Sequence, residues 1–158
     1  DTININDSVN VYIPYININN YLYDRFGTFA YKHFATILIE EILQLEKHAE
    51  DQKMYVHVCE NHFEIIVSNK GKLELYNTFN YYSKEDFIYY ILFTAEQLQL
   101  NPETFPLVFL GAIFEEDELY QMAYKYIRHI KFGKPNTKYT FKEKPKAAHN
   151  NFILTHSI

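Results

Sequence analysis

The pattern of hydrophobic and polar residues predicts both strands and helices. Residues Val9 to Tyr15 alternate between apolar side chains and polar residues or Pro14, which predicts a strand that the proline ends or confines to a sheet edge. We expect the next stretch, up to Gly27, to be irregular. Later in the chain, three strand-like runs with turn chemistry at Asn69-Lys70-Gly71 predict an antiparallel meander. These runs are Met54–Cys59, Phe63–Ser68 and Leu73–Phe79.

Apolar residues recur at helical spacing in three other segments. The first covers residues 29–45 and fades into a polar run, 46–53, that we take as a boundary. The second has the strongest signal, because Ser83 and Asp86 form a capping box ahead of a long apolar stripe. A third helix is expected to begin near Glu116, where several acids suit the positive end of the helix dipole.

A wholly apolar run, Leu107–Leu110, predicts a strand that is buried on both faces and parallel to a neighbour. Two more apolar runs, Ile130–Phe132 and Phe152–Leu154, predict one or two further strands. The sequence therefore predicts a mixed α/β fold, with a three-strand antiparallel meander, parallel strands, and helices packed on the sheet.

Composition indicates a folded protein in a reducing compartment. The chain has 158 residues, and 47% of them are hydrophobic, which is enough to bury a core. Cys59 is the lone cysteine, so no internal disulfide can form, and we expect a cytoplasmic protein. No apolar stretch approaches the roughly 18 residues that span a bilayer, so no membrane insertion is expected. Because the chain opens on Asp1 and runs directly into a strand-like pattern, we expect that an N-terminal portion is missing.

The charges are segregated along the chain. The net charge is −5, yet the segment 125–146 holds eight of the 15 basic residues and one acid, which makes it +7 and the remainder −12. Aromatic residues are interleaved with these lysines, as in proteins that bind single-stranded nucleic acid, and the candidate contacts are Lys131, Lys138 and Lys142. The alternative, which we favour, is a solvated lysine loop.

The order of elements from Met54 onward resembles the ribonuclease H-like unit that actin-like ATPases use twice. The stretches VNVYIPYININNYLYDRFGTFAYKH, YNTFNYYSKEDFIYYILFTAEQL and LNPETFPLVFLGAI are more closely similar to an uncharacterised bacterial family, domain of unknown function 3822, with an actin-like ATPase fold. This resemblance covers nearly the whole chain. It implies that residues 1–50 close a first lobe and that residues 53–158 form most of a second, and it implies no activity.

In an actin-like ATPase, an acidic residue and a glycine-rich hairpin hold the phosphates of the nucleotide. The matching stretch here is Val56–Phe63, in which His57 and Cys59 stand at the positions of the acid and the glycine. Bulky side chains keep phosphate oxygens away from backbone N–H groups, so the resemblance predicts that the phosphate site is lost. Gly111, after the buried strand, fits a plain turn better than a nucleotide-facing loop.

Other chemistry is weaker in the sequence. His57, Cys59 and His62 lie within a short span and could ligate zinc, but ordinary packing is the favoured interpretation, and we expect no metal and no cofactor. A two-metal nuclease would need acids centrally placed on strands, whereas Glu60 and Glu64, together with Glu115, are expected at solvated hairpin or loop positions. Serine hydrolase, Walker, Rossmann and EF-hand patterns are absent.

Four tyrosines around the strongest helix form a candidate interaction surface, since aromatic residues commonly anchor partners. They are Tyr81, Tyr82, Tyr89 and Tyr90. The hypothesis from the sequence is a non-catalytic, degenerate actin-like protein that binds another protein or itself. The alternatives are an ATPase whose nucleotide site is completed by missing N-terminal residues, and weak nucleic-acid binding by the basic segment.

Overall fold

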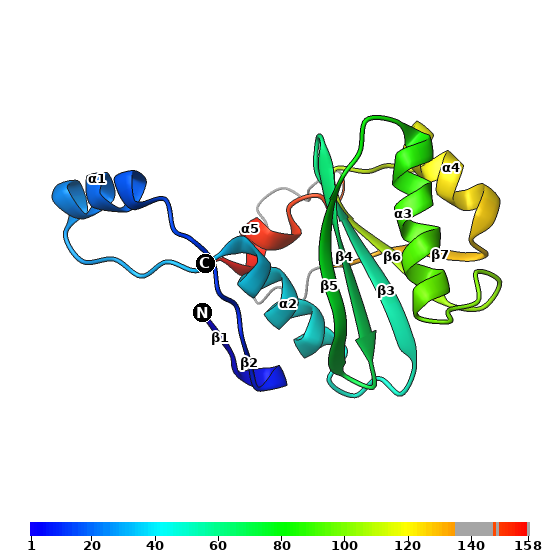
Figure 1. Ribbon diagram of the computed structural model, residues 1–158, viewed down its shortest axis with the longest axis horizontal. Coiled ribbons are helices and arrows are strands. Elements are labelled where there is room, and N and C mark those ends of the chain that lie inside the picture. The colour runs from blue at the N-terminus through cyan, green and yellow to red at the C-terminus, as the bar shows by residue number, and fades with distance from the viewer. Residues whose placement is uncertain (135–146, 148, 158) are drawn as a thin grey trace.

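A five-stranded mixed sheet forms the centre of the computed structural model, which describes residues 1–134, 147 and 149–157 (Figure 1). The strand order is β5-β4-β3-β6-β7. Strands β3, β4 and β5 form an antiparallel meander, whereas β6 runs parallel to β3, and β7 runs parallel to β6. The strands are β3 (Gln52–Val58), β4 (His62–Asn69), β5 (Lys72–Asn80), β6 (Pro106–Gly111) and β7 (His129–Phe132).

Helices cover both faces of this sheet (Figure 1). Helices α3 (Lys84–Gln97) and α4 (Glu118–Tyr126) cover one face, and α2 (Phe34–Leu45) and α5 (Phe152–His156) lie on the other. Since β3, β4 and β6 are covered on both sides, apolar side chains are buried on both faces. The larger cluster, on the α3 side, includes Val56, Phe63, Phe87 and Phe109. The smaller cluster includes Leu38, Ile42, Tyr55, Ile66 and Phe152.

The strongest helix signal of the sequence is confirmed in atomic detail. The backbone N–H of Asp86 donates to Ser83 Oγ at 3.1 Å, and the N–H of Ser83 donates to the Asp86 carboxylate at 3.2 Å. This capping box satisfies backbone N–H groups that a helix end leaves unpaired. The predicted meander, the buried parallel strand β6, the helix after Glu116 and the strand β7 are also confirmed.

The N-terminal region is anchored to the start of α2. The short strands β1 (Thr2–Ile3) and β2 (Ser8–Val9) pair on either side of a 3-10 turn (Asn4–Asn6). The carboxylate of Asp1 accepts hydrogen bonds from the backbone N–H of His33 at 2.7 Å and from Thr36 Oγ1 at 2.9 Å. Beyond β2 the chain leaves the body and carries α1 (Ile16–Phe26), which lies apart from the sheet and has no buried residue (Figure 1).

Two predictions about the local structure are wrong, and one helix was not predicted. The alternating run Val9–Tyr15 pairs with the N-terminal strand only at Val9 and Asn10, and no described strand lies beside the rest of it. The stretch expected to be irregular contains α1. The apolar run at Phe152 forms α5 instead of a strand: its N–H groups bond along the chain, as from Thr155 to Asn151 at 3.0 Å, and Phe152 packs against α2. Short apolar runs carry no period that separates strand from helix.

None of the helices in the described ranges has the length and apolar character needed to cross a bilayer.

Gly111 provides a test of the close approach between β3 and β6. A Cβ at Gly111 would lie 2.3 Å from the carbonyl oxygen of Val58, and its φ is +79°, so Gly111→Ala adds backbone strain and a clash. We expect this substitution to lower the free energy of unfolding by about 3 kcal/mol or more, measured by urea denaturation. The control is Gly27→Ala, which has φ +76° but no atom within 4 Å and lies at the end of α1, where it should change global stability by less than about 1 kcal/mol. Equal effects of the two substitutions would contradict the role assigned to the clash.

Candidate functional site

The carboxyl ends of β3 and β6 meet at one edge of the sheet, where Val58 lies opposite Gly111. Open α/β sheets bind their ligands outside the carboxyl ends of the parallel strands, so a ligand site is expected at this edge. The N–H of Ala112 donates to the carbonyl of Val58 at 2.8 Å, and the N–H of Gly111 donates to the carbonyl of His149 at 2.9 Å. These bonds fix the backbone around the edge.

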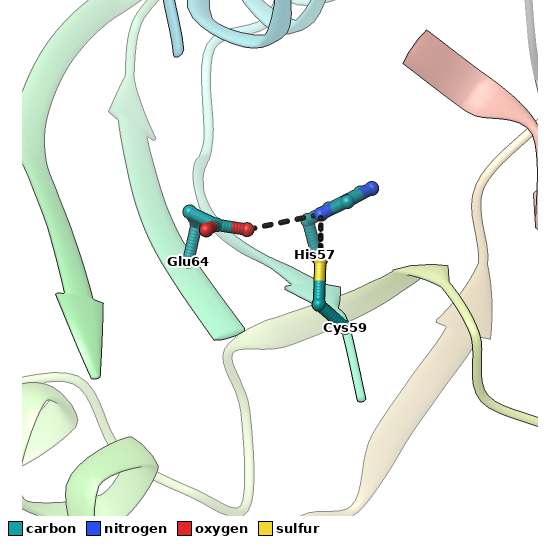
Figure 2. A group of neighbouring side chains, drawn as sticks. All are labelled: His57, Cys59 and Glu64. Atoms are coloured by element: carbon teal, nitrogen blue, oxygen red, sulfur yellow. Dashed lines mark hydrogen bonds and ion pairs between the residues drawn. The ribbon is translucent and has the colours of Figure 1, made fainter. Parts of the chain in front are cut away.

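A buried polar cluster lies at this edge, on the sheet face that α2 covers (Figure 2). His57 near the end of β3 and Glu64 near the start of β4 are directly opposite in the antiparallel pair, and His57 Nδ1 is 3.0 Å from Glu64 Oε2. Cys59 Sγ is 3.7 Å from the same nitrogen. His57 is 7% exposed and Glu64 only 1%. Because an ionised carboxylate can only accept, its contact with His57 requires the hydrogen on Nδ1.

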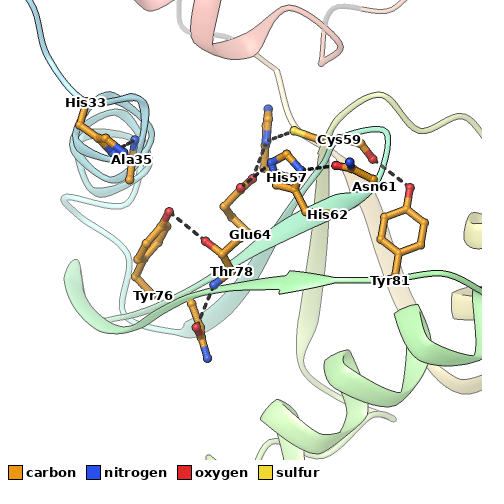
Figure 3. Close-up of polar contacts among 11 residues, drawn as sticks. His33, Ala35, His57, Cys59, Asn61, His62, Glu64, Tyr76, Thr78 and Tyr81 are labelled. Carbon is orange, nitrogen blue, oxygen red and sulfur yellow. Dashed lines mark hydrogen bonds and ion pairs between the residues drawn. The ribbon is translucent and has the colours of Figure 1, made fainter. Parts of the chain in front are cut away.

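His62 completes the surroundings of the carboxylate (Figure 3). Its Nε2 is 3.3 Å from Glu64 Oε1, and its Nδ1 is 2.8 Å from the side-chain oxygen of Asn61. Each oxygen of Glu64 therefore faces one imidazole. Within the described ranges, the ion pairs of Glu64 are made with these two histidines and with no lysine or arginine. A carboxylate this deeply buried is stabilised only if a cation or several donors compensate for its lost hydration.

The negative charge of Glu64 acts on the groups around it. Burial, and then the charge of Glu64, raise the pKa of the Cys59 thiol to about 11. The pKa of Tyr76, which lies on the same face, is also raised, first by burial and with a contribution from Glu64, although a hydrogen bond with Thr78 opposes the change. At neutral pH Cys59 is therefore a thiol, and a poor nucleophile.

The turn between β3 and β4 is tightly bonded (Figure 3). The N–H of Cys59 donates to the carbonyl of His62 at 2.9 Å. Tyr81 Oη donates to the carbonyls of Cys59, at 2.9 Å, and of Glu60, at 3.0 Å. One N–H that a phosphate cradle would use is thus occupied within the turn, and none of the turn residues is glycine.

The prediction that Glu64 is a solvated residue at a hairpin end is wrong. Glu64 is the third residue of β4 and faces the buried side of the sheet, while Glu60 and Glu115 are exposed as expected. The signal that could have found it is the period of two, since Glu64 shares a strand face with His62 and Ile66. Pairing of β4 with β3 then places it opposite His57.

The four predicted tyrosine contacts divide into two pairs. Tyr81 packs against Phe63 and Phe87, and Tyr90 stacks on Phe79, so both belong largely to the α3 side of the core. Tyr82 is 93% exposed and Tyr89 is 59% exposed. Of the predicted lysine contacts, Lys131 is exposed on β7, and Lys138 and Lys142 lie outside the described residues.

A second feature is the segment 9–31, which we call the apolar arm. Its exposed apolar side chains are more numerous than those of any single helix of the body. They are Val9, Val11, Ile13, Tyr15, Ile16, Ile18, Tyr21, Tyr23, Phe26 and Tyr31. Val11 and Ile13 are 87% and 91% exposed, whereas Asn10, between Val9 and Val11, donates to Thr36 Oγ1 at 2.9 Å. The extended part of the arm therefore has one anchored face and one apolar face in solvent.

Comparison with known proteins identifies the family. The model of the family described as "Protein of unknown function (DUF3822)" matches residues 1–130. The chain belongs to this family. No curated protein matches the chain.

One solved structure identifies the fold. The chain is similar to a Bacteroides thetaiotaomicron protein with an actin-like ATPase fold and unknown function, with a TM-score of 0.65, 26% identity, and coverage of 73% of this chain and 45% of that one. The predicted actin-like ATPase fold is confirmed. The chain also matches an AlfA filament bound to AMPPNP, with a TM-score of 0.44 and 14% identity over 72% of this chain and 40% of that one. The chain spans less than half the length of either structure.

The raised pKa of Cys59 gives a measurable consequence. Relative to an ordinary thiol, a pKa of about 11 lowers the thiolate fraction near pH 8 by about 100-fold, so alkylation of the chelator-treated protein should be slow and should accelerate with pH until about 11. Glu64→Gln removes the negative charge and should shift the alkylation profile to lower pH. Stopped-flow alkylation across pH measures both. A profile centred near the pKa of a free cysteine would contradict this electrostatic account.

Proposed function

We propose that the protein is a non-catalytic member of the actin-like fold that works by self-association through the apolar arm. The observation that supports this proposal is that the arm holds ten of the 19 exposed large apolar side chains of the described residues. Contiguous exposed apolar surface of this kind is characteristic of interaction sites in soluble proteins.

A second copy of the chain is the binding partner that best fits the arm. No charged residue occurs from Val9 through Tyr23, whereas the whole chain carries a net charge of −5, so the arm is where two copies can approach without repulsion. The residues Val11, Tyr12 and Ile13 make no backbone hydrogen bond to any described residue. An extended segment with free N–H and C=O groups can pair with its own copy around a two-fold axis.

The magnitudes are compatible with a specific but moderate association. Burying one exposed Val or Ile side chain contributes about 1.5–3 kcal/mol, and a two-fold contact buries each such residue twice. Association itself costs about 4–15 kcal/mol. Burial of Val9, Val11 and Ile13 from both copies contributes about 9–18 kcal/mol before this cost, so the range includes the roughly 8 kcal/mol of a micromolar dimer.

Size-exclusion chromatography with light scattering tests the arm. At tens of micromolar, the unsubstituted chain should have the mass of a dimer or larger, and Ile13→Asp should reduce it to the mass of a monomer, because each copy would bury a charge in the contact. The matched control is Tyr82→Asp, which also places a charge at a fully exposed apolar residue, outside the arm. It should leave the mass unchanged.

Each alternative outcome is informative. If Tyr82→Asp dissociates the protein and Ile13→Asp does not, the tyrosine surface that the sequence suggested is the interface. A chain that is monomeric without substitution contradicts self-association and leaves a different protein as the occupant of the arm.

The proposal also includes loss of nucleotide chemistry. The support is local: His57 and Cys59 stand where the fold family has an acid and a glycine, and the Cys59 N–H is already bonded within the turn. We expect isothermal titration with ATP and Mg²⁺ at millimolar nucleotide to give no heat of binding, and we expect no phosphate release. Saturable binding accompanied by phosphate release would instead support the alternative, an ATPase. Nucleic-acid binding by the basic segment remains a sequence prediction, since Lys138 and Lys142 are not described.

A further inference from the structure

We propose that the cluster at the ends of β3 and β4 is a binding site for a zinc-class transition metal ion, with His57, Cys59, Glu64 and His62 as ligands. The donor atoms are His57 Nδ1, Cys59 Sγ, a Glu64 carboxylate oxygen and His62 Nε2 (Figures 2 and 3). One ligand atom of each of His57, Cys59 and Glu64 lies within 4.8 Å of the others. The site does not depend on the proposed self-association.

The separations of the donor atoms suit a tetrahedral ion. With metal–nitrogen and metal–oxygen bonds of about 2.0 Å and a metal–sulfur bond of about 2.3 Å, tetrahedral neighbours are about 3.3 Å apart for nitrogen and oxygen and about 3.6 Å apart for sulfur and nitrogen. The observed separations are 3.0 Å for His57 to Glu64, 3.7 Å for Cys59 to His57 and 3.3 Å for His62 to Glu64. Small shifts would bring the atoms of His57, Cys59 and Glu64 to coordinating positions. His62 faces the other oxygen of Glu64 and would turn its ring toward these three atoms to complete the tetrahedron.

The sheet already holds these side chains in place. His57 and Glu64 are a cross-strand pair within a regular antiparallel ladder, so their Cα positions are fixed by backbone bonds and not by a loop. Cys59 and His62 flank the two-residue turn, and the N–H of Cys59 is bonded to the carbonyl of His62. The His62 side chain is 36% exposed, which provides an entry path for the ion from solvent.

The charges at the site favour a cation. Glu64 is 1% exposed, and among the described residues only the two imidazoles approach its oxygens as possible cations. A divalent ion with one carboxylate, one thiolate and two neutral imidazoles forms a neutral centre and offsets the cost of burying the carboxylate. The mixed set of nitrogen, sulfur and oxygen donors selects zinc or cobalt over Mg²⁺ and Ca²⁺, which prefer oxygen ligands alone.

Cobalt substitution tests the site directly. The full chain, stripped with a chelator under reducing conditions, is titrated with Co²⁺ and followed by absorption spectroscopy. We expect one equivalent to give intense visible bands of tetrahedral Co²⁺ together with a near-ultraviolet thiolate-to-cobalt charge-transfer band. Zn²⁺ should displace the cobalt and bleach the bands, whereas an excess of Mg²⁺ should not.

Matched variants separate this site from adventitious binding. Cys59→Ser, which is nearly isosteric, should abolish the charge-transfer band and weaken cobalt binding by at least about tenfold, and Glu64→Gln should weaken binding to a similar degree. His48→Ala is the control, since His48 is exposed and lies outside the cluster, and it should bind cobalt as the unsubstituted chain does. Circular dichroism verifies that each variant is folded.

Two results would overturn the proposal. Absence of tetrahedral bands in the unsubstituted chain would mean that the cluster is a hydrogen-bonded buried pair and not a metal site. Cobalt binding that survives Cys59→Ser with the same spectrum and affinity would place the ion elsewhere on the surface.

Discussion

The structure depends on β3 being paired on both sides, antiparallel to β4 and parallel to β6. A strand in this central position must be apolar on both faces. Met54, Val56 and Val58 are buried on the face that α3 covers, and Tyr55 is buried on the face that α2 covers. The central position also requires β6 to approach closely at its end, where Gly111 leaves no room for a Cβ beside the carbonyl of Val58. The helices on the two faces and the polar cluster at the edge are positioned by these two ladders.

The same central position makes the His57–Glu64 pair energetically unusual. The pair replaces apolar contacts at the end of an otherwise apolar strand, and breaking it by removing one partner would leave a buried group without compensation. A structural role and a metal-binding role of this pair both require the same backbone arrangement, since in either role the two side chains must face each other. The Cys59 thiol, 3.7 Å from His57 Nδ1, adds a soft donor of the kind that a transition metal prefers.

The sequence predicts what periodicity and capping chemistry determine locally. The meander, β6 and α3 follow from runs with a clear period and from the capping box at Ser83. The wrong predictions share a cause. The hydrophobic pattern of a segment is local, but the secondary structure that the segment adopts depends on which other segments lie beside it. Val9–Tyr15 has the pattern of a strand, but no described strand lies beside the residues after Asn10, and Phe152 is buried against α2 in a short helix. Glu64 was predicted to be solvated because it is a glutamate near a hairpin, whereas its position in the alternation along β4 places it on a buried face.

The apolar arm and the edge cluster are related through the start of α2. His33 caps this helix by accepting from the N–H of Ala35 at 3.1 Å, and its backbone is held by Asp1, so the arm ends where α2 begins. The next residue, Phe34, packs against His57 with ring centroids 5.5 Å apart. The first turn of α2 therefore contacts the imidazole at the end of β3. Two residues of chain and one aromatic contact separate the arm from the edge cluster.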